Sequence, residues 1–343
     1  MKFGIFDHLD RRDEPLEKFY EDRLEMAAAY EAAGFYSYHI AEHHATPLGM
    51  APSPNIFLAA VARRTTRLRF GPLVYLLPMY HPVRLAEEIC MLDHLSGGRL
   101  DVGVGRGISP HEVGFYGVAP EDRQEIFEES LELLMKSLTS PRLSHDGKWY
   151  RIADTPVELA PLQTPYPPVW YGAGNELGAE FSARHGMNMV TLGANERVKG
   201  LVAMYHEFWD STRDDPMRAG SSVQTPLAGV GRHVFVADTD AEAERLARPA
   251  YVHWYDSVTK LWREHGGAPV TGMLIGSYDE ARRIGVSVCG SPATVRAELA
   301  AQIEDIGFNY LVCQFAWGTL SHAQEMHSLS LFRTEVMPLL SAA

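Results

Sequence analysis

The sequence predicts an α/β fold of the (βα)8 TIM barrel class with insertions. Three observations support it: strand-like apolar runs alternate with amphipathic segments, eight such strands can be counted, and a chain of 343 residues suits this barrel. An open doubly wound sheet is the competing fold. It is disfavoured because the segment after the first strand, FDHLDRRDE, contains no glycine-rich dinucleotide turn.

The first half of the chain supplies four strands, each followed by a helix. Strands are expected at 2–6, 36–41, 68–76 and 99–105. The first helix begins near Leu16 and ends at Gly34, a suitable C-cap, and further helices are expected at 55–65, 83–95 and 122–138. Residues 139–166 break this rhythm with several prolines and the turn HDGKWY, which predicts a short hairpin insertion.

The second half continues the alternation. Strands are expected at 168–174, 188–192, 233–237 and 309–315, with helices near 176–185, 195–213 and 239–262. A Gly-rich irregular stretch is expected at 265–290, after which Ser291 and Pro292 supply an N-cap and an N1 proline for a further helix. We therefore expect a single barrel domain over 1–343, with insertions around 139–166 and 265–290.

Composition limits the class of protein. With 46% hydrophobic residues and a formal net charge of -13, the chain suits a globular protein that nucleic acids and anionic membranes repel on average. The N-terminal segment MKFGIFDHLDRRDE has neither a signal peptide nor a transmembrane span, so a soluble cytoplasmic protein is expected. Cys90, Cys289 and Cys313 form no CxxC pair, which predicts three reduced thiols.

The segment AEHH, with Glu42, His43 and His44, follows the second expected strand. In a barrel of this class the active site lies at the C-terminal ends of the strands, so the triplet is a candidate site. Neighbouring residues at a strand end project to opposite sides, which argues against one metal ion shared by His43 and His44. No metal site is predicted. A hydrogen-bonded structural role remains the alternative for either histidine.

Two glycine-containing strand ends indicate a phosphate. DVGVGRGISP (101–110) embeds Arg106 among small residues, and WYGAGNELG (170–178) leads into a helix whose first N–H groups would face an anion. Together they suit one phosphorylated cofactor, although tight turns without a ligand explain either one alone. His81 in LPMYHPVR is a weaker candidate, since a strand-to-helix turn explains it equally well.

As a set, the segments resemble the bacterial luciferase-like, flavin-dependent monooxygenase family. The resemblance is carried by MKFGIF, EAAGF, AEHH, LPMYHPVRLAEE, LDHLSGGRLDVGVGRG, PVWYGAG and HWYDS, and it spans essentially the whole chain. It implies a barrel that uses reduced FMN, supplied by a separate NAD(P)H:flavin reductase, to insert one oxygen atom of O2 into an organic substrate. Members usually form dimers, so a homodimer is expected.

The resemblance also assigns residues. His43 matches the catalytic histidine beside the C4a-peroxyflavin, with Glu42 and His44 as supporting neighbours. Arg106 matches the arginine that binds the FMN phosphate, and the backbone N–H groups of Gly174, Asn175 and Gly178 match the second phosphate-binding segment. A non-prolyl cis peptide beneath the flavin ring would join Leu73 to Val74. Gly105 departs from the luciferase α subunit, which has a reactive cysteine there, so light emission is not carried over.

Two other functions remain open. A coenzyme F420-dependent oxidoreductase of the same superfamily would transfer hydride and ignore O2, and a non-catalytic flavin-binding partner subunit is a third possibility. The substrate is expected to be a small apolar molecule, because Met50, Phe57, Met79 and Trp254 lie in segments that can form an oily pocket.

Overall fold

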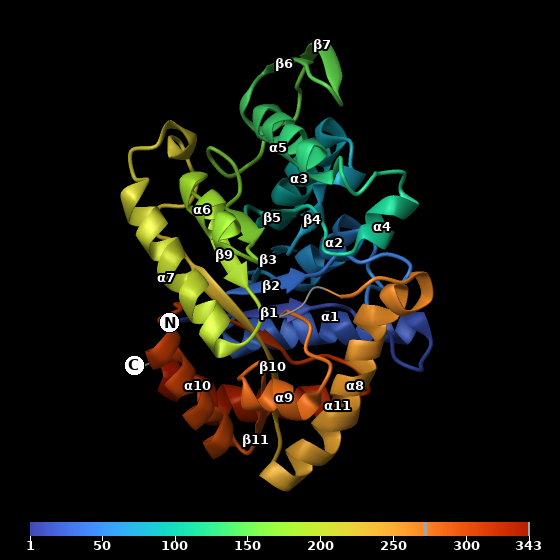
Figure 1. The fold of residues 1–343 in the computed structure, drawn as a ribbon, viewed down its shortest axis with the longest axis vertical. Coiled ribbons are helices and arrows are strands. Elements are labelled where there is room, and N and C mark those ends of the chain that lie inside the picture. Colours follow the sequence, from blue (N-terminus) through green and yellow to red (C-terminus); the bar gives the residue numbers. More distant parts are fainter. Residues whose placement is uncertain (270–272, 342–343) are drawn as a thin grey trace.

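A ring of parallel strands forms the centre of the molecule (Figure 1). The computed structural model describes residues 1–269 and 273–341, except for the side chain of Ser341. The strands of the ring are β1 (Lys2–Asp7), β2 (Ser37–Ile40), β3 (Arg69–Pro72), β4 (Tyr75–Leu76), β5 (Val102–Gly105), β8 (Val169–Gly172), β9 (Asn188–Thr191), β10 (Ala228–Val236) and β12 (Tyr310–Gln314).

Hydrogen bonding joins the strands in the order β3-β2-β1-β12-β10-β9-β8-β5-β4, and the pairings are parallel. Because β3 and β4 are successive parts of one stretch, 69–76, the two ends of this order meet and the ring closes there. Counted with β3 and β4 as one strand, the eight predicted barrel strands are present. The predicted (βα)8 barrel is therefore confirmed.

Helices follow the strands and surround the ring (Figure 1). They are α1 (Leu16–Ala33), α2 (Pro54–Arg64), α3 (Pro82–Ser96), α4 (Pro110–Phe115), α5 (Arg123–Thr139), α6 (Glu176–Arg184), α7 (Asn195–Ser211), α8 (Asp240–His265), α9 (Tyr278–Arg283), α10 (Pro292–Ile306), α11 (His322–Leu331) and α12 (Met337–Ser341). Short helical turns lie at η1 (Leu77–Met79), η2 (Pro216–Arg218) and η3 (Phe332–Val336). Gly34 ends α1 in a left-handed conformation, with φ of 87°, and the Ser291 side chain caps α10, both as predicted.

Strand β10 begins at Ala228, earlier than the expected start at 233. The glycines of the added segment dilute the apolar pattern, which explains why the sequence did not reveal it. They are required by close contacts, since a Cβ at Gly229 would lie 2.8 Å from a methyl of Val190 and one at Gly231 would lie 2.2 Å from a methyl of Leu192.

The two expected insertions have different outcomes. Residues 139–166 contain the predicted hairpin, formed by β6 (Arg142–Asp146) and β7 (Arg151–Pro156), which pair antiparallel and project beyond α5 at the top of Figure 1. The expectation that 265–290 is irregular was wrong. This stretch contains α9 and a buried parallel strand, β11 (Ser287–Gly290), which pairs with the second half of β10. Its residues 270–272 lie outside the described part of the chain.

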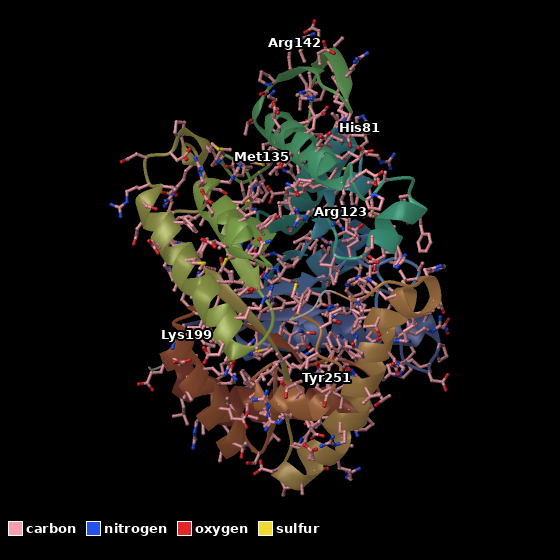
Figure 2. The ribbon with its side chains drawn as sticks, viewed as in Figure 1. His81, Arg123, Met135, Arg142, Lys199 and Tyr251 are labelled. Carbon is pink, nitrogen blue, oxygen red and sulfur yellow. The ribbon has the colours of Figure 1, made fainter. Side chains whose placement is uncertain are left out.

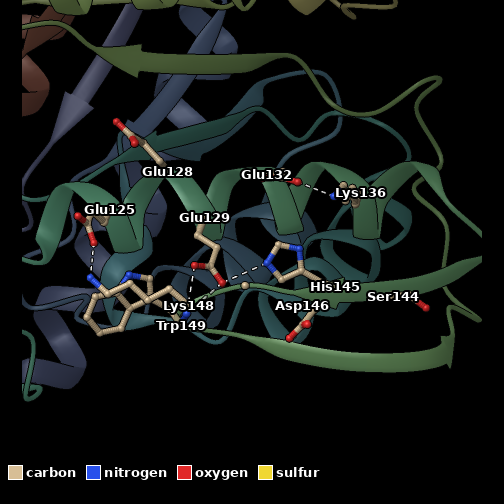
Figure 3. Close-up of a pocket in the computed structure, with 11 residues that line it drawn as sticks. Glu125, Glu128, Glu129, Glu132, Lys136, Ser144, His145, Asp146, Lys148 and Trp149 are labelled. Carbon is tan, nitrogen blue, oxygen red and sulfur yellow. Dashed lines mark hydrogen bonds and ion pairs between the residues drawn. The ribbon is translucent and has the colours of Figure 1, made fainter.

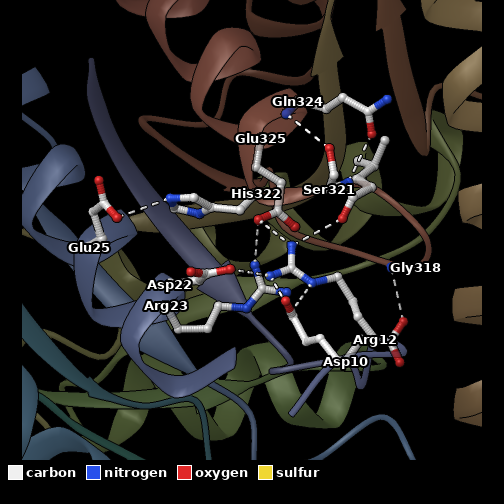
Figure 4. Close-up of polar contacts among 12 residues, drawn as sticks. Asp10, Arg12, Asp22, Arg23, Glu25, Gly318, Ser321, His322, Gln324 and Glu325 are labelled. Atoms are coloured by element: carbon white, nitrogen blue, oxygen red, sulfur yellow. Dashed lines mark hydrogen bonds and ion pairs between the residues drawn. The ribbon is translucent and has the colours of Figure 1, made fainter. Parts of the chain in front are cut away.

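A buried ionic network fixes the end of β1 against helices α1 and α11 (Figure 4). Glu325 on α11 accepts hydrogen bonds from Arg12 at 3.0 Å and from Arg23 at 2.9 Å. Asp7, the last residue of β1, accepts from Tyr38 at 2.8 Å and from the Leu9 N–H at 2.8 Å. Because separating buried partners of this kind is costly, these bonds hold the turn after β1 in place.

Among the described residues, no helix is long and apolar enough to cross a membrane.

Candidate active site

A cavity of 720 Å³ opens at the C-terminal ends of the barrel strands. Its lining includes residues on the strands and residues that follow them: Phe6 on β1, His8 after β1, Glu42 and His43 after β2, Arg106 after β5, Gly174 after β8, His233 on β10 and Gln314 on β12. This is the position that a barrel of this class uses for binding and catalysis. Glu42, His43 and Arg106, which were singled out because they follow strands, therefore line this cavity.

His43 is paired with Glu112, a residue of α4 that sequence reasoning did not assign to the site. The ring Nδ1 lies 3.0 Å from Glu112 Oε1, and both side chains are buried. Burial lowers the pKa of His43, but the charge and the hydrogen bond of Glu112 outweigh it, so the pKa stands above its usual value. Because Glu112 engages Nδ1, Nε2 is the ring nitrogen left to act toward the cavity.

Glu42 and His44 form a separate pair beside this one. His44 Nε2 lies 2.9 Å from Glu42 Oε1, and its Nδ1 lies 2.9 Å from the hydroxyl of Tyr116. The other Glu42 oxygen accepts from the Leu76 N–H at 3.0 Å, which ties the end of β2 to β4. Glu42 lines the cavity, whereas His44 does not. Both therefore hold the strand ends on either side of His43 in place.

Two arginines give one side of the cavity its positive charge. Arg106 follows β5, as predicted, and hydrogen-bonds Gln124; Arg123 begins α5 and donates to the carbonyl of Gly107 at 3.1 Å. Both arginines line the cavity. Burial, followed by the charge of Arg106, lowers the pKa of Arg123, so the two guanidinium groups repel each other. An anion between them would relieve that repulsion.

The N-terminus of α6 completes this cationic side, which we define as Arg106, Arg123 and residues 174–178. Gly174, Asn175 and Gly178 all line the cavity. The Gly178 N–H donates to the Asn175 side chain at 2.9 Å. Asn175 acts as the N-cap of α6, a role that its short amide side chain fills through this bond.

The peptide bond between Leu73 and Val74 is cis, as predicted, and both residues line the cavity between β3 and β4. Gly105 lies beside them on β5, the strand that pairs with β4. A Cβ at Gly105 would lie 2.4 Å from Cγ2 of Val74, so no larger residue fits there without displacing Val74. This contact gives a structural reason for the glycine at position 105, by which the chain departs from the luciferase α subunit.

The opposite side of the cavity carries polar residues without net charge. We call this the neutral side and define it by four residues: His8, His233, Trp254 and Gln314. Burial lowers the pKa of His233 to about 3, with a further contribution from Arg232. Burial and the charges of His43 and His233 hold the pKa of His8 well below its usual value. The rings of His8 and His43 are 5.7 Å apart, so the boundary between the two sides falls between these histidines.

Sequence reasoning missed five of these residues, namely His8, Glu112, Arg123, His233 and Gln314. His8 directly follows strand β1, and Glu112 lies on α4 in the segment after β5, so inspection of the segments after the strands could have found both. His233 and Gln314 lie inside strands, where an isolated polar residue gives no signal from periodicity.

Several weaker expectations fall outside the cavity. His81 is exposed and its ring packs against Tyr150 on the hairpin side. Of the residues proposed for an oily pocket, Trp254 lines the cavity, whereas Met50, Phe57 and Met79 do not. Phe57 packs in the outer core against Tyr20, because its helix α2 lies on the outside of the ring.

A second hollow, of 580 Å³, lies between α5 and the hairpin (Figure 3). Glu129 occupies its centre, where it accepts hydrogen bonds from the N–H groups of Trp149 and Tyr150 and lies 3.1 Å from His145 Nε2. These bonds fasten the hairpin turn onto α5, so the hollow is a structural junction. Within the described ranges, no group of three or more His, Cys, Asp or Glu side chains is arranged to hold a metal ion.

Comparison with known proteins gives one consistent result. Residues 1–310 match the family model of luciferase-like monooxygenases. The chain is 37% identical over 337 residues to an uncharacterised protein of Sinorhizobium fredii, covering 98% of this chain and 96% of the relative. It is 28% identical over 263 residues to the oxygenase component of a flavin-dependent trigonelline monooxygenase from Acinetobacter baylyi, covering 74% of this chain and 70% of the relative.

Solved structures share the fold over nearly the full length. The oxygenating constituent of 3,6-diketocamphane monooxygenase from Pseudomonas putida, in complex with FMN, has a TM-score of 0.81 at 23% identity and covers 98% of both chains. A coenzyme F420-dependent reductase from Methanopyrus kandleri has a TM-score of 0.69 at 18% identity and covers 99% of both chains. The fold alone thus accommodates either cofactor.

Proposed function

The chain belongs to the luciferase-like monooxygenase family, and on that premise we propose that it is the oxygenase of a two-component system that uses reduced FMN and O2 to oxygenate a small organic molecule. The observation that carries the proposal is a single cavity with a cationic side next to the buried His43–Glu112 pair. A phosphorylated cofactor and a proton-transfer group would therefore meet in one space.

The residues of the cationic side fit the FMN phosphate. Arg106 and Arg123 supply two guanidinium groups, and the N-terminus of α6 supplies a positive helix end. Leu73 and Val74 supply an apolar surface on the wall beside them. Bound reduced FMN would supply the activation of O2 and the oxygen atom that enters the substrate.

His43 is proposed as the proton-transfer group of this site. Glu112 binds Nδ1 and favours the protonated ring, so Nε2 can hold a proton toward the cavity or return one. Glu112 is a positioning residue, because it acts through His43. Glu42 and His44 keep the strand ends of β2 and β4 together and so fix the direction in which His43 points.

The test uses the purified chain, anaerobically reduced FMN and oxygenated buffer in a rapid-mixing experiment, followed by the absorbance of oxidised FMN. We expect bound flavin to return to the oxidised form at least about tenfold more slowly than free flavin, because a positioned proton donor and exclusion of water change its reaction with O2. Return at the rate of free reduced FMN, despite measured binding, would contradict the proposal.

A parallel arm with reduced coenzyme F420 separates the main alternative. Tight binding of F420 together with no binding of FMN would favour a hydride-transferring oxidoreductase. The chain is also proposed to act as a cytoplasmic homodimer with a separate NAD(P)H:flavin reductase. Turnover by the purified chain, given reduced flavin and no second subunit, would exclude the role of a non-catalytic partner subunit.

A further inference from the structure

Three buried side chains on the neutral side present polar atoms that have no hydrogen-bond partner of ordinary geometry in the described part of the protein. The unpartnered atoms are the two ring nitrogens of His233, Nε1 of Trp254 and Oε1 of Gln314. The three residues are 2%, 4% and 3% exposed, and all of them line the cavity. Burying such atoms unpaired reduces stability, so their presence in one cavity wall needs an explanation.

The backbone brings these atoms together. His233 and Gln314 are directly paired positions on the neighbouring parallel strands β10 and β12, so their side chains project on the same side of the sheet. Trp254 reaches them from α8, and its ring centroid lies 4.2 Å from that of His233. Gln314 also lies near His8 and favours the charged form of that ring, but Oε1 is still without a well-formed hydrogen bond.

The chemistry of the three side chains is that of a neutral hydrogen-bonding site. Trp254 offers a donor and Gln314 an acceptor, while the neutral imidazole of His233 offers one of each. Phe6, Val258 and Val286 supply apolar surface in the same cavity. A charged ligand group would find no opposite charge among the residues of this side, whereas an uncharged oxygen function would satisfy the unpaired atoms.

We propose that the neutral side binds an uncharged substrate by a carbonyl or hydroxyl oxygen, held by His233, Trp254 and Gln314, with the hydrocarbon body against the apolar wall. The inference rests on the proposed function, because it takes the cationic side as the flavin site and the neutral side as the substrate site. It narrows the expectation of a small apolar substrate to one that carries a carbonyl or hydroxyl oxygen.

The test compares three ligands of one skeleton, namely tetralin, 1-tetralone and 1-tetralol, by equilibrium dialysis against the purified chain without flavin. We expect the ketone and the alcohol to bind about tenfold more tightly than the hydrocarbon, since each forms hydrogen bonds that the cavity otherwise lacks. In His233→Leu and in Gln314→Met, the preference should fall to about twofold. Val258→Ala is the matched control, because it removes only apolar contact and should weaken binding of all three ligands alike.

Circular dichroism and thermal unfolding establish that each variant is folded. The proposal is overturned if tetralin binds as tightly as its oxygenated relatives, if the preference survives both substitutions, or if none of the three ligands binds. Because no flavin is present, these outcomes are independent of the reaction with O2. A chain that handles reduced FMN as proposed but shows no preference for oxygen would contradict this inference alone.

Discussion

The cationic side and the neutral side of the cavity differ in how their polar side chains are paired. On the cationic side, Arg106, Arg123 and Asn175 each already have a protein partner. On the neutral side, His233 and Trp254 have polar atoms that none of the described residues satisfies. We infer that the side chains of the cationic side are already held in position to bind an anion, whereas the polar atoms of the neutral side gain their hydrogen bonds only from a ligand.

His43 stands at the boundary between the two sides, and its removal should have the largest effect. In His43→Ala, we expect bound reduced FMN to lose most of the roughly tenfold slowing of its reaction with O2, because the proton-transfer group is lost. Stopped-flow absorbance measures this. His81→Ala, an exposed histidine outside the cavity, serves as the control, and an unchanged rate in His43→Ala with normal flavin binding would remove the proposed role.

The proposed role of the cationic side in phosphate binding can be tested by comparing flavins with and without a phosphate. Arg106→Ala should weaken FMN binding about 10-fold to 100-fold, because a charge-assisted contact to phosphate is lost, and Arg123→Ala should act in the same direction. Binding of riboflavin, which lacks the phosphate, should change little in either variant. Arg123 lies toward the middle of the molecule and Arg142, the first residue of β6, at its upper end (Figure 2), so Arg142→Ala is the matched control. Equal losses for FMN and riboflavin would place the phosphate elsewhere.

The pH dependence sharpens the contrast between His43, at the boundary, and the histidines of the neutral side. Glu112 raises the pKa of His43, so the protonated ring persists to higher pH than an ordinary histidine would allow. In Glu112→Gln that charge is absent, and the part of the pH profile that depends on protonated His43 should shift to lower pH, with a loss of about tenfold at neutral pH. Glu112→Asp should restore part of the profile. An unshifted profile in Glu112→Gln would rule out the positioning role.

The smallest expected effect concerns stability. His233→Leu removes two unpaired buried nitrogens and should raise the free energy of unfolding by about 1 kcal/mol. His39 is the contrast: it is also buried, and although its Nδ1 has no partner among the described residues, its Nε2 lies 2.8 Å from the hydroxyl of Tyr310. His39→Leu should therefore lower stability by about 1 kcal/mol. Denaturant unfolding checks both, and destabilisation of similar size in the two variants would contradict the contrast.

The sequence predicted the barrel and the cationic side better than the neutral side, for physical reasons. Alternating apolar periodicity reports strands and helices directly, and glycines with an arginine at a strand end form a local signal, as at Arg106. The partnership of His43 with Glu112 joins residues 69 positions apart, and that of His233 with Gln314 depends on strand register. Neither is visible in local sequence. Strand β11 was missed because it is only four residues long and follows a Gly-rich stretch.

A crystal structure of the chain with FMN would test the account most directly. The account predicts the phosphate within hydrogen-bond distance of Arg106 and Arg123, near the N-terminus of α6, with the flavin ring against Leu73 and Val74 and the space beside His233 and Gln314 left free for substrate. A phosphate bound beside His233, or a flavin ring that fills the neutral side, would contradict it.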